Sequence, residues 1–553
     1  MSIHIITSEK ILENISIENI RSVHGKTKIL ENFSTYLMDE SKLDGDAEWI
    51  FFPKSEIEIA SILKYAKKNN IKLCISAART GIVGSSVPSG GLILSTENMK
   101  EIIGFGFDKN RGNYFIRVEP GVTLNELNDI ILKKELDSVS ELTLNAIKSF
   151  KNSNSLFHYP VDPTEMSATI GGNVATNASG ANSLKYGPTR EWVKRMRIML
   201  SSGEILEIPR GKYFASKENE FILIKSDGVK LQFKIPDYVF NTTVKNAAGI
   251  YSKPNMDLID LFIGSEGILG IIIEIDIWIV EKQALISNVL FFNSEEDSIN
   301  FTEELSKNTI IAPEFIEFFS VEALELLRDI QNKDPSALKV PQIPKEAKSA
   351  IFFDFLYTDE DLDTKFTELN KISENCNTNL SNGWSGYESQ DIARFKHFRH
   401  ILPEVINAII AERKQKFPEL HKLGTDMSVP KNHFRKMIRF YHSVLDDTNL
   451  DYVIFGHIGD SHVHVNILPK NMEELKLGEM VYEEFAKKAV GFGGSISGEH
   501  GIGKIKREYL KIMYSQREIN EMRLLKQNLD PNLILNYGNI VNFDNDDDLP
   551  KNL

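Results

Sequence analysis

The segment PVDPTEMSATIGGNVATNASGANSLKYGPTR, residues 160–190, decides how the chain can fold. A flexible linker would also be rich in small residues, but it rarely embeds apolar side chains such as Ile170 and Val174 among its glycines. Because glycine has no side chain, Gly171 and Gly172 let the backbone approach a ligand closely. Successive main-chain N–H groups can then hold an anion such as a pyrophosphate. The segment therefore predicts a folded ligand-binding loop.

The chain upstream of this segment alternates between strand and helix patterns over residues 50–135. IKLCIS and GGLILST read as strands, with RTGIVGSS as the loop between them. FIRVEPGVT reads as a strand and a turn, and VTLNELNDIILKK reads as a helix. Such alternation is typical of an α/β unit. Residues 1–45 are polar and look mostly helical, which predicts an N-terminal arm.

The most apolar stretch of the chain lies downstream, in LIDLFIGSEGILGIIIEIDIWIV, residues 258–280. Charged residues such as Asp260, Glu266 and Glu274 interrupt it, so the stretch predicts strands around a glycine turn and not a membrane span. Glycines become fewer after about residue 284, and longer helix and strand patterns follow. We therefore place a domain boundary there.

The totals exclude several classes of protein. The 553 residues carry a net charge of −14, which argues against a general nucleic-acid-binding protein because a phosphate backbone requires a basic face. Cys74 and Cys376 are far apart and form no CxxC motif, so no cysteine-ligated iron–sulfur cluster or zinc site is expected. The N-terminus shows no secretory signal. We expect a cytoplasmic protein of two or three domains with no transmembrane segment, while peripheral contact with a membrane stays open.

The segment DYVIFGHIGDSHVHVNIL, residues 451–468, reads as a β-hairpin. On the returning strand, His462, His464 and Asn466 share one face because side chains alternate along a strand. His457 ends the first strand, so the hairpin brings it close to His464. Neutral imidazoles at that distance suit a zinc, manganese or iron ion. His462 reads more readily as a neighbouring polar group than as a ligand.

A second segment, SISGEHGIG at residues 495–503, places Glu499 and His500 side by side between glycines. Adjacent residues of an extended segment point in different directions, so Glu499 can face a metal while His500 faces a substrate. Two histidines and a carboxylate leave open positions at a metal for a substrate. The same pair also fits a plain surface loop, and these residues alone leave the two readings evenly balanced.

The order of these motifs resembles the vanillyl-alcohol-oxidase/p-cresol-methylhydroxylase superfamily of flavoproteins. Within it, the chain is most similar to the branch of D-lactate dehydrogenase, the glycolate oxidase D-subunit and D-2-hydroxyglutarate dehydrogenase. The resemblance spans roughly residues 48–543. The motifs that carry it are SAARTGIVGSSVP (76–88), DPTEMSATIGGNVATNASG (162–180), GSEGILGII (264–272), HIGDSHVHVNI (457–467), SGEHGIG (497–503) and LKQNLDPNLILNYGNIV (525–541).

The resemblance implies an α+β fold. Its FAD-binding domain, of the p-cresol-methylhydroxylase type, has two α/β parts, and its substrate cap domain has an antiparallel sheet and helices. The expected divisions are an N-terminal helical arm at 1–47, the FAD-binding domain at 48–284, the cap domain at 285–510, a segment returning to the flavin domain at 511–543 and an acidic tail at 544–553.

The resemblance also implies which residues form the site. The metal ligands carried over are His457, His464 and Glu499, and the catalytic residues are His500, Arg399 and Asn466. The residues carried over for FAD binding are Ala77, Ala78, Arg79, Thr80, Gly81, Ser85, Ser86, Asp162, Thr169, Gly171, Gly172, Asn173, Thr176, Ser179, Gly267, Ile272 and Asn536.

The chain departs from the family pattern at several positions. Relatives have more glycine in the first flavin loop, where Arg79 stands here, and this arginine either adds charge near the flavin or substrate or braces the loop. Residues 71–91 contain no histidine, so we expect FAD to be bound non-covalently. Gly424 stands where D-2-hydroxyglutarate relatives tend to have a lysine, and Pro403 where they tend to have a hydroxyl residue. Both differences argue against that particular substrate.

The resemblance therefore predicts an FAD-dependent, metal-assisted enzyme that oxidises a small 2-hydroxy acid, D-lactate-like, with His500 as the base. Its electron acceptor is a quinone, an electron-transfer flavoprotein, a cytochrome or an iron–sulfur partner, and a homodimer is allowed. Two alternatives share the fold: a non-redox flavin transferase of the alkyl-dihydroxyacetonephosphate synthase type, and a non-catalytic flavin subunit. The set of His457, His464 and Glu499 with Asn466 favours the dehydrogenase.

Overall fold

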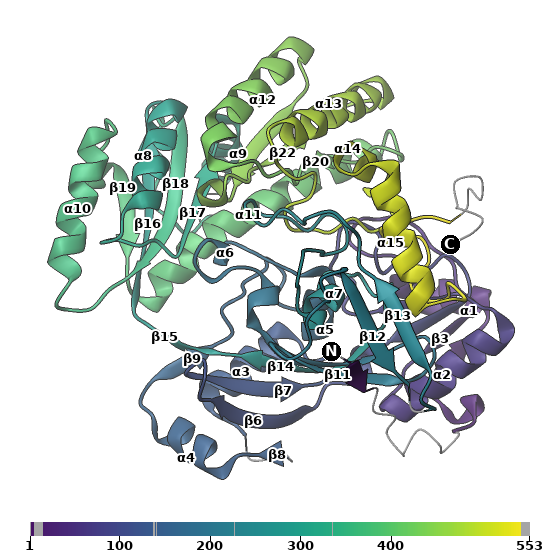
Figure 1. Ribbon diagram of the computed structural model, residues 1–553. Coiled ribbons are helices and arrows are strands. Elements are labelled where there is room, and N and C mark those ends of the chain that lie inside the picture. The colour runs from purple at the N-terminus through teal and green to yellow at the C-terminus, as the bar shows by residue number, and fades with distance from the viewer. Residues whose placement is uncertain are drawn as a thin grey trace.

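The computed structural model describes residues 2–4, 15–136, 139, 141–225, 227–334 and 336–543. Figure 1 shows two parts of the molecule. The purple, blue and teal first half of the chain forms the lower part of the view, and the green elements form the upper part. The yellow helix α15 (Gln516–Leu529) leaves the upper part and descends beside the lower one. The C-terminal region therefore contacts the N-terminal half.

The first sheet is the predicted α/β unit. Strands β3 (Trp49–Phe51), β5 (Leu92–Ser95) and β4 (Leu73–Ser76) run parallel, and β2 (Ser22–His24) adds an antiparallel edge. Helix α2 (Glu56–Asn69) connects β3 to β4. It buries Ile59, Ile62, Leu63 and Ala66, which recur at the spacing of one helix face. This part of the α/β prediction is confirmed.

The prediction of mostly helix before residue 46 is wrong at two places. β2 is a strand, and β1 (Ser2–His4) pairs in parallel with β12 (Glu220–Ile224), which pairs in turn with β13 (Lys230–Lys234). Helix α1 (Lys26–Asn32) is the α-helix that the described part of this segment contains. Strands of three residues are too short for a periodic pattern, so only their partners elsewhere in the chain define them.

The second sheet of the lower part has the strand order β11 (Ile205–Pro209), β10 (Val193–Met199), β14 (Ile271–Trp278), β7 (Asn113–Val118), β6 (Ile102–Asp108) and β8 (Glu141–Leu142). Helix α3 (Leu124–Lys133) and helix α4 (Leu144–Asn152) accompany it, and a small pair, β9 (Leu156–His158) and β15 (Val280–Lys282), lies at its side. The predicted helix at residues 122–134 and the strand at 115–118 are confirmed.

One prediction for this region is wrong. The sequence predicted strands on both sides of the glycine turn in residues 258–280, but Leu258–Phe262 is helix α7 and only the second half is a strand. A short continuous apolar run has the same composition whether it is a buried strand or a buried helix, so periodicity alone cannot separate them.

The upper part is built on a seven-stranded antiparallel sheet. Its strand order is β19 (Gly383–Gly386), β16 (Leu285–Phe292), β18 (Ser349–Leu356), β17 (Phe315–Phe319), β21 (Tyr452–Gly456), β22 (His464–Ile467) and β20 (Leu423–Gly424). Every pairing of neighbours in it is antiparallel. This agrees with the antiparallel sheet expected for the cap.

Helices cover both faces of this sheet (Figure 1). Val289 and Phe291 of β16 pack with α9 (Val321–Lys333) and α11 (Ser389–Lys414). Leu290 and Phe292, on the opposite face, belong to the core that includes α8 (Glu295–Lys307), α10 (Leu362–Asn375), α12 (Phe434–Thr448) and α13 (Met472–Gly491). Alternate residues of one strand thus enter two different cores, as the strand period requires.

The chain ends by returning to the first sheet. After α14 (Leu510–Met513) and α15, Leu73 N–H of β4 donates to Ile534 O at 2.7 Å, and Asn536 N–H donates to Leu73 O at 2.9 Å. These bonds extend the edge of the parallel sheet with a segment from the far end of the sequence. Within the ranges that the structure describes, no helix combines the length and apolar character needed to cross a bilayer.

Candidate active site

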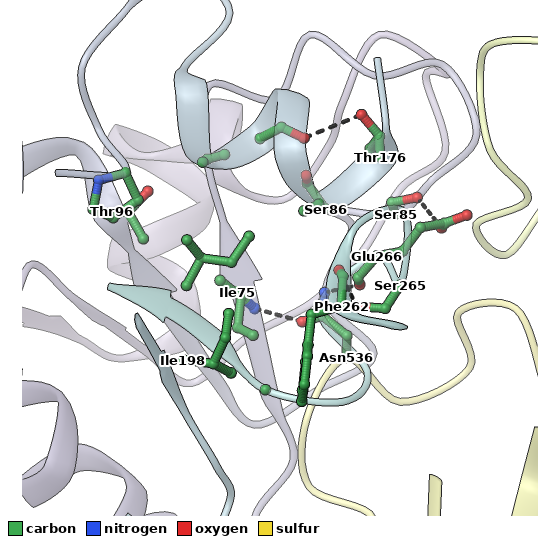
Figure 2. Close-up of a pocket in the computed structure, with 18 residues that line it drawn as sticks. Ile75, Ser85, Ser86, Thr96, Thr176, Ile198, Phe262, Ser265, Glu266 and Asn536 are labelled. Carbon is green, nitrogen blue, oxygen red and sulfur yellow. Dashed lines mark hydrogen bonds between the residues drawn. The ribbon is translucent and has the colours of Figure 1, made fainter. Parts of the chain in front are cut away.

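The lower part contains a cavity with an empty volume of about 640 Å³. Figure 2 shows it between Ile75 of β4, helix α5 (Ile170–Thr176), which carries Thr176, and the turn that carries Ser265 and Glu266. Nine of the residues predicted to bind FAD line it: Ala77, Ser85, Ser86, Gly171, Gly172, Thr176, Gly267, Ile272 and Asn536. The other predicted positions, Ala78, Arg79, Thr80, Gly81, Asp162, Thr169, Asn173 and Ser179, are not among its lining residues. Motifs from four distant parts of the sequence thus meet around one space.

The glycines of this cavity allow close approaches of the backbone. A Cβ atom on Gly171 would lie 2.5 Å from Pro120 Cβ and 2.8 Å from Pro120 O, which no side chain tolerates. A Cβ atom on Gly172 would lie 3.2 Å from Ala77 Cβ. Thr169 caps α5 by accepting a bond from Gly172 N–H. The packing therefore holds the first turn of α5 directly against the first flavin loop.

Sequence reasoning missed the apolar wall of the cavity and one buried acid. The additional lining residues are Ile75, Thr96, Pro120, Ala175, Ile198, Phe262, Ser265, Glu266 and Gly270. Several of them, such as Ile198 and Phe262, were not among the residues predicted from the sequence. Their apolar type carries no functional signal, and only the fold places them at a cavity.

Glu266 connects the cavity to the SGEHGIG loop. Its carboxylate accepts bonds from Ser85 Oγ at 2.5 Å, Ile502 N at 2.7 Å and Gly503 N at 2.8 Å. The side chain is buried, and this burial raises its pKa. Asn536 completes the junction: its Nδ2 donates to Glu266 O at 2.7 Å, and its Oδ1 accepts from Ile75 N at 2.6 Å. One carboxylate therefore fixes the loop after His500 to the wall of the flavin cavity.

The three predicted metal ligands come together in the upper part. The predicted hairpin is confirmed, because β21 pairs with β22 and places Phe455 opposite His464. His457 Nε2 lies 3.2 Å from Glu499 Oε2, and His464 Nε2 lies 3.8 Å from the same oxygen. His457 and Glu499 are buried and His464 is half-buried. The ligand atoms of His457, His462, His464 and Glu499 all lie within 4.8 Å of one another.

In both His457 and His464, the ring nitrogen Nδ1 is held by an oxygen acceptor. His457 Nδ1 lies 2.5 Å from Glu317 Oε1, and His464 Nδ1 lies 2.9 Å from Thr425 O. A carboxylate and a carbonyl only accept, so each Nδ1 donates. Nε2 of His464 keeps its lone pair, whereas Nε2 of His457 also lies within hydrogen-bond distance of the Glu499 carboxylate and would lose its proton to a bound metal. Metal-binding histidines carry such a partner on the other nitrogen. Both Nε2 atoms face Glu499, so the donor set fits a divalent metal.

Two residues from the lower part of the molecule hold Oε1, the second carboxylate oxygen of Glu499. Lys245 Nζ lies 2.5 Å from Glu499 Oε1, and Ser179 Oγ donates to the same oxygen at 3.2 Å. Burial alone would raise the pKa of Glu499, but His457 and Lys245 hold it well below its usual range. Ser179, predicted as a flavin residue, therefore contacts the candidate metal ligand. Lys245 was missed, because a single lysine in KNAAGIY gives no pattern.

Acidic and basic side chains alternate from Glu499 through His457 and Glu317 to Arg399. Burial lowers the pKa of His457, but Glu317 and Glu499 raise it to about 9. Burial likewise opposes the charge of Glu317, yet Arg399 and His457 lower its pKa to about 2. Arg399 Nη2 lies 3.3 Å from Glu317 Oε1. The predicted substrate arginine is thus part of the same cluster, three contacts from Glu499.

His500 faces a different carboxylate. Its Nδ1 lies 3.2 Å from Asp426 Oδ2, and its ring stacks on that of His464 with centroids 5.5 Å apart. Asp426 also accepts from the backbone N–H groups of Glu499 and His500 and from Lys506 Nζ at 2.8 Å. Asp426 is fully buried, and although burial opposes its charge, His500 and Lys506 hold its pKa well below the usual range. This aspartate was missed because it stands alone in TDMSVP.

Asn466 and Gly424 lie opposite each other in the sheet. Gly424 pairs with Asn466 across β20 and β22, and a Cβ atom on Gly424 would lie 3.2 Å from Asn466 Oδ1. The face on which His464 and Asn466 lie is the one where Val453 and Phe455 pack with α9 and α11. Asn466 is buried beside the histidines. The side chain of Asn466 therefore occupies the space directly beside residue 424.

Arg79 braces the first flavin loop. Its backbone has a φ of 63°, which glycine adopts more easily than arginine. Its Nη1 donates to Ser76 Oγ at 3.2 Å and to Ala77 O at 3.0 Å, and its guanidinium lies 4.0 Å from the ring centroid of Tyr36. The sequence allowed two roles for Arg79, and these contacts are those of a residue that braces the loop.

Comparison with known proteins identifies the family. The model of the FAD binding domain matches residues 47–141 and 153–209, and the model of FAD linked oxidases, C-terminal domain, matches residues 282–540. The chain belongs to the FAD-linked oxidase family. The matched ranges correspond to the lower and upper parts of this FAD-linked oxidase, and the resemblance inferred from the motifs is confirmed.

The relatives of this FAD-linked oxidase extend over most of its length. A D-lactate dehydrogenase of Anaerostipes hadrus is 28% identical over 91% of either chain. The glycolate oxidase subunit GlcD of Bacillus subtilis is 26% identical over 88% of either chain. Among solved structures, p-cresol methylhydroxylase shares the fold with a TM-score of 0.62 at 14% identity, covering 94% of either chain. The predicted α+β fold is confirmed.

The cavity of this FAD-linked oxidase fits FAD. Its lining combines polar groups from the predicted flavin motifs, Ser85, Ser86, Thr176 and Asn536, with an apolar wall of Ile75, Ile198, Phe262 and Ile272. The chain has no histidine in residues 71–91, so non-covalent binding stays our prediction.

Proposed function

We propose that this FAD-linked oxidase is a metal-assisted dehydrogenase that oxidises a small 2-hydroxy acid, D-lactate-like, to the 2-oxo acid. The names of its relatives support this substrate class, since they act on D-lactate or belong to glycolate oxidase. The metal would be divalent and held by His457, His464 and Glu499. The alternative non-redox transferase gains no specific support from the site.

One observation carries the proposal: a single loop joins the metal cluster to the flavin cavity. Glu499 lies at its start, against His457, and Gly503 lies four residues later, bonded to the cavity residue Glu266. His500 stands between them. A substrate at this loop would lie between the candidate metal ligands and the wall of the flavin cavity, which is the position that oxidation by a flavin requires.

His500 is the proposed base that takes the substrate hydroxyl proton. A carboxylate only accepts, so the 3.2 Å contact with Asp426 Oδ2 places the proton of the neutral ring on Nδ1 and leaves Nε2 to accept. Asp426 is in turn fixed by backbone N–H groups and Lys506. The ring orientation is therefore set before a substrate arrives, as base catalysis requires.

Arg399 and Asn466 are proposed to position the substrate carboxylate. Only one nitrogen of Arg399, Nη2, makes an ion pair, with Glu317. A guanidinium carries five N–H donors, so Arg399 has further donors for a carboxylate. Asn466 offers an amide on the face of the histidines. When bound, the metal lowers the pKa of the substrate hydroxyl and FAD accepts the hydride.

The residues at positions 424 and 403 favour a short substrate. Gly424 contributes no side chain next to Asn466, and Pro403 of α11 contributes no hydrogen-bond donor or acceptor beyond its carbonyl. A second carboxylate on the substrate would find no donor from these two positions. We therefore place lactate-sized monocarboxylates ahead of dicarboxylates.

His500→Ala tests the proposed base. We expect the rate of flavin bleaching by the hydroxy acid to fall by about 10²–10⁴-fold, because positioned proton transfer contributes that much. The metal content and the flavin spectrum should stay unchanged, since His500 is not among the three proposed ligands. His442→Ala is the matched control, because its ring lies against Glu295 on the outer side of the cap. A His500→Ala protein that bleaches at the wild-type rate would refute the role of His500.

A further inference from the structure

We propose that His462 is a third histidine ligand of the metal, binding through Nδ1, so that the protein supplies three nitrogens and one oxygen. This inference rests on the proposed function, because it concerns the same metal. From the sequence, His462 was interpreted as a neighbouring polar group. The structure places it within the cluster itself.

The position of His462 is that of a ligand. One ring nitrogen of His462 lies within 4.8 Å of a possible ligand atom of each of His457, His464 and Glu499. Its ring centroid lies 4.7 Å from that of His464 and 5.6 Å from that of His457. The side chain is fully buried, with 0% of its surface exposed. The three rings and the carboxylate thus surround one small volume.

One ring nitrogen of His462 is anchored and the other is free. Nε2 lies 3.0 Å from Asp426 Oδ1. Asp426 accepts from Lys506 Nζ and from backbone N–H groups, so it is a carboxylate and Nε2 of His462 must donate to it. The lone pair of the neutral ring is therefore on Nδ1. Among the described residues, that buried Nδ1 has no hydrogen-bond partner.

A purely structural role would not explain this free nitrogen. A buried polar atom without a partner destabilises the folded state, and proteins rarely leave one unpaired. His457 and His464 each anchor Nδ1 and present Nε2 to Glu499. His462 shows the same arrangement with the nitrogens exchanged, since Asp426 anchors Nε2. A metal ion would satisfy Nδ1 and explain why the ring is held from the other side.

With His462 as a fourth protein ligand, fewer of the metals considered, zinc, manganese and iron, would suit the site. A 2-hydroxy acid that binds through its hydroxyl and one carboxylate oxygen adds two donors, which completes a six-coordinate site. Zinc favours four ligands, whereas manganese and iron accept octahedral nitrogen and oxygen sites. Of the three metals considered, the four-residue set therefore favours Mn²⁺ or Fe²⁺ over Zn²⁺.

The test compares two variants of His462, each of which keeps a nitrogen near the position of only one of the two ring nitrogens. His462→Gln keeps an amide donor near the position of Nε2, so its contact with Asp426 survives while the Nδ1 ligand is lost. His462→Asn places an amide near Nδ1 and loses the contact with Asp426. The probe is Mn²⁺ alone, titrated into the full-length protein against a chelator. His442→Gln, remote from the cluster, is the matched control.

We expect His462→Gln to lower Mn²⁺ affinity by at least about tenfold, since losing even a partner of a ligand costs that much. X-ray absorption of the Mn²⁺-loaded wild-type protein should show three imidazoles, which does not depend on the folding of any variant. Two imidazoles in the wild type, or unchanged affinity in His462→Gln, would overturn the inference while leaving the proposed function intact. Mn²⁺ binding that survives His457→Gln would overturn both.

Discussion

The candidate ligands of this site are each oriented by a second residue. Glu317 holds Nδ1 of His457 at 2.5 Å, and Thr425 O holds Nδ1 of His464 at 2.9 Å. Lys245 holds the oxygen of Glu499 that does not face the histidines. Because each ligand keeps only one direction free, the donor atoms converge before a metal binds. Preorganisation of this kind is what gives a metal site its affinity.

Glu317→Gln tests this anchoring at the scale of one residue. The variant removes the charge that orients the ring of His457 and pairs with Arg399, so we expect affinity for Mn²⁺ to fall by about 10–100-fold. Glu314→Gln is the matched control, because Glu314 is equally buried at the start of the same strand but pairs with Lys185 and Tyr186. A chelator competition measures both variants. Equal affinity of Glu317→Gln and the control would show that the anchor contributes nothing.

Residues with a local pattern could be predicted from the sequence, and isolated ones could not. His457, His464 and Glu499 stand in motifs, and the structure brings them together. Glu317, Asp426 and Lys245 are single charged residues in unremarkable segments, so only the fold reveals that each touches the cluster. The same is true of Glu266, whose role depends on Ser85 and on the loop after His500.

Helix α5 and the loops beside it form the element on which the flavin cavity depends. Gly171 lies in the first turn of α5, directly against the backbone of Pro120. Helix α7 and strand β14 supply the opposite wall through Phe262 and Ile272. The cavity therefore requires a glycine at residue 171, where α5 meets the backbone of Pro120.

Gly171→Ala should weaken this element. The new methyl group would lie 2.5 Å from Pro120 Cβ and 2.8 Å from a backbone oxygen, which cannot move aside without distortion. We expect a loss of about 1–3 kcal/mol in the free energy of unfolding and weaker FAD binding. Gly491→Ala is the control, since no described atom lies within 4 Å of a Cβ there. Denaturant melts and FAD titration report the two effects, and an unperturbed Gly171→Ala would contradict the packing argument.

Strand β18 of the cap carries a titrating group that affects stability. Asp354 is buried, its Oδ1 has no hydrogen-bond partner among the described residues, and burial raises its pKa to about 7. The unfolded chain releases this proton near pH 4. Between about pH 4 and pH 7 the native state thus binds more protons than the unfolded state. The contribution of Asp354 to the free energy of unfolding of the protein therefore falls as the pH rises through that range.

Asp354→Asn should remove this pH dependence. At pH 8 we expect the variant to be more stable than the wild type by about 2–4 kcal/mol, because it no longer buries a charge. At pH 4 the two proteins should have nearly equal stability, since Asp354 is then neutral in the native state and only about half ionised in the unfolded state. Thermal melts across this range measure the difference, with the exposed Asp359→Asn as control. A wild type that becomes more stable from pH 4 to pH 7, with Asp354→Asn unchanged at pH 8, would contradict the assignment.

Elements differed in how well the sequence predicted them. The hairpin β21–β22 has alternating side chains and a turn sequence, and it forms as predicted. Helix α7 was predicted as a strand, because LIDLF is apolar throughout and shows no period. The N-terminal strands β1 and β2 were missed, since three residues and a remote partner define each one.

At the scale of the whole molecule, the two parts meet through contacts that no local pattern shows. Ser179 and Lys245 reach from the flavin-binding half to Glu499, and Ile502 and Gly503 reach back from the cap to Glu266. The order of the motifs predicted the family and the fold. It could not predict that residues of each half complete the site of the other.

The central claim is that one enzyme brings FAD, a metal and a 2-hydroxy acid together. The measurement that tests it most directly is the visible spectrum of the purified protein during anaerobic addition of a panel of D- and L-2-hydroxy acids, before and after chelation. We expect a small D-acid such as D-lactate to bleach the flavin absorbance, a chelator to abolish the bleaching, and Mn²⁺ to restore it. A yellow protein that no hydroxy acid bleaches, or bleaching that a chelator leaves untouched, would contradict it.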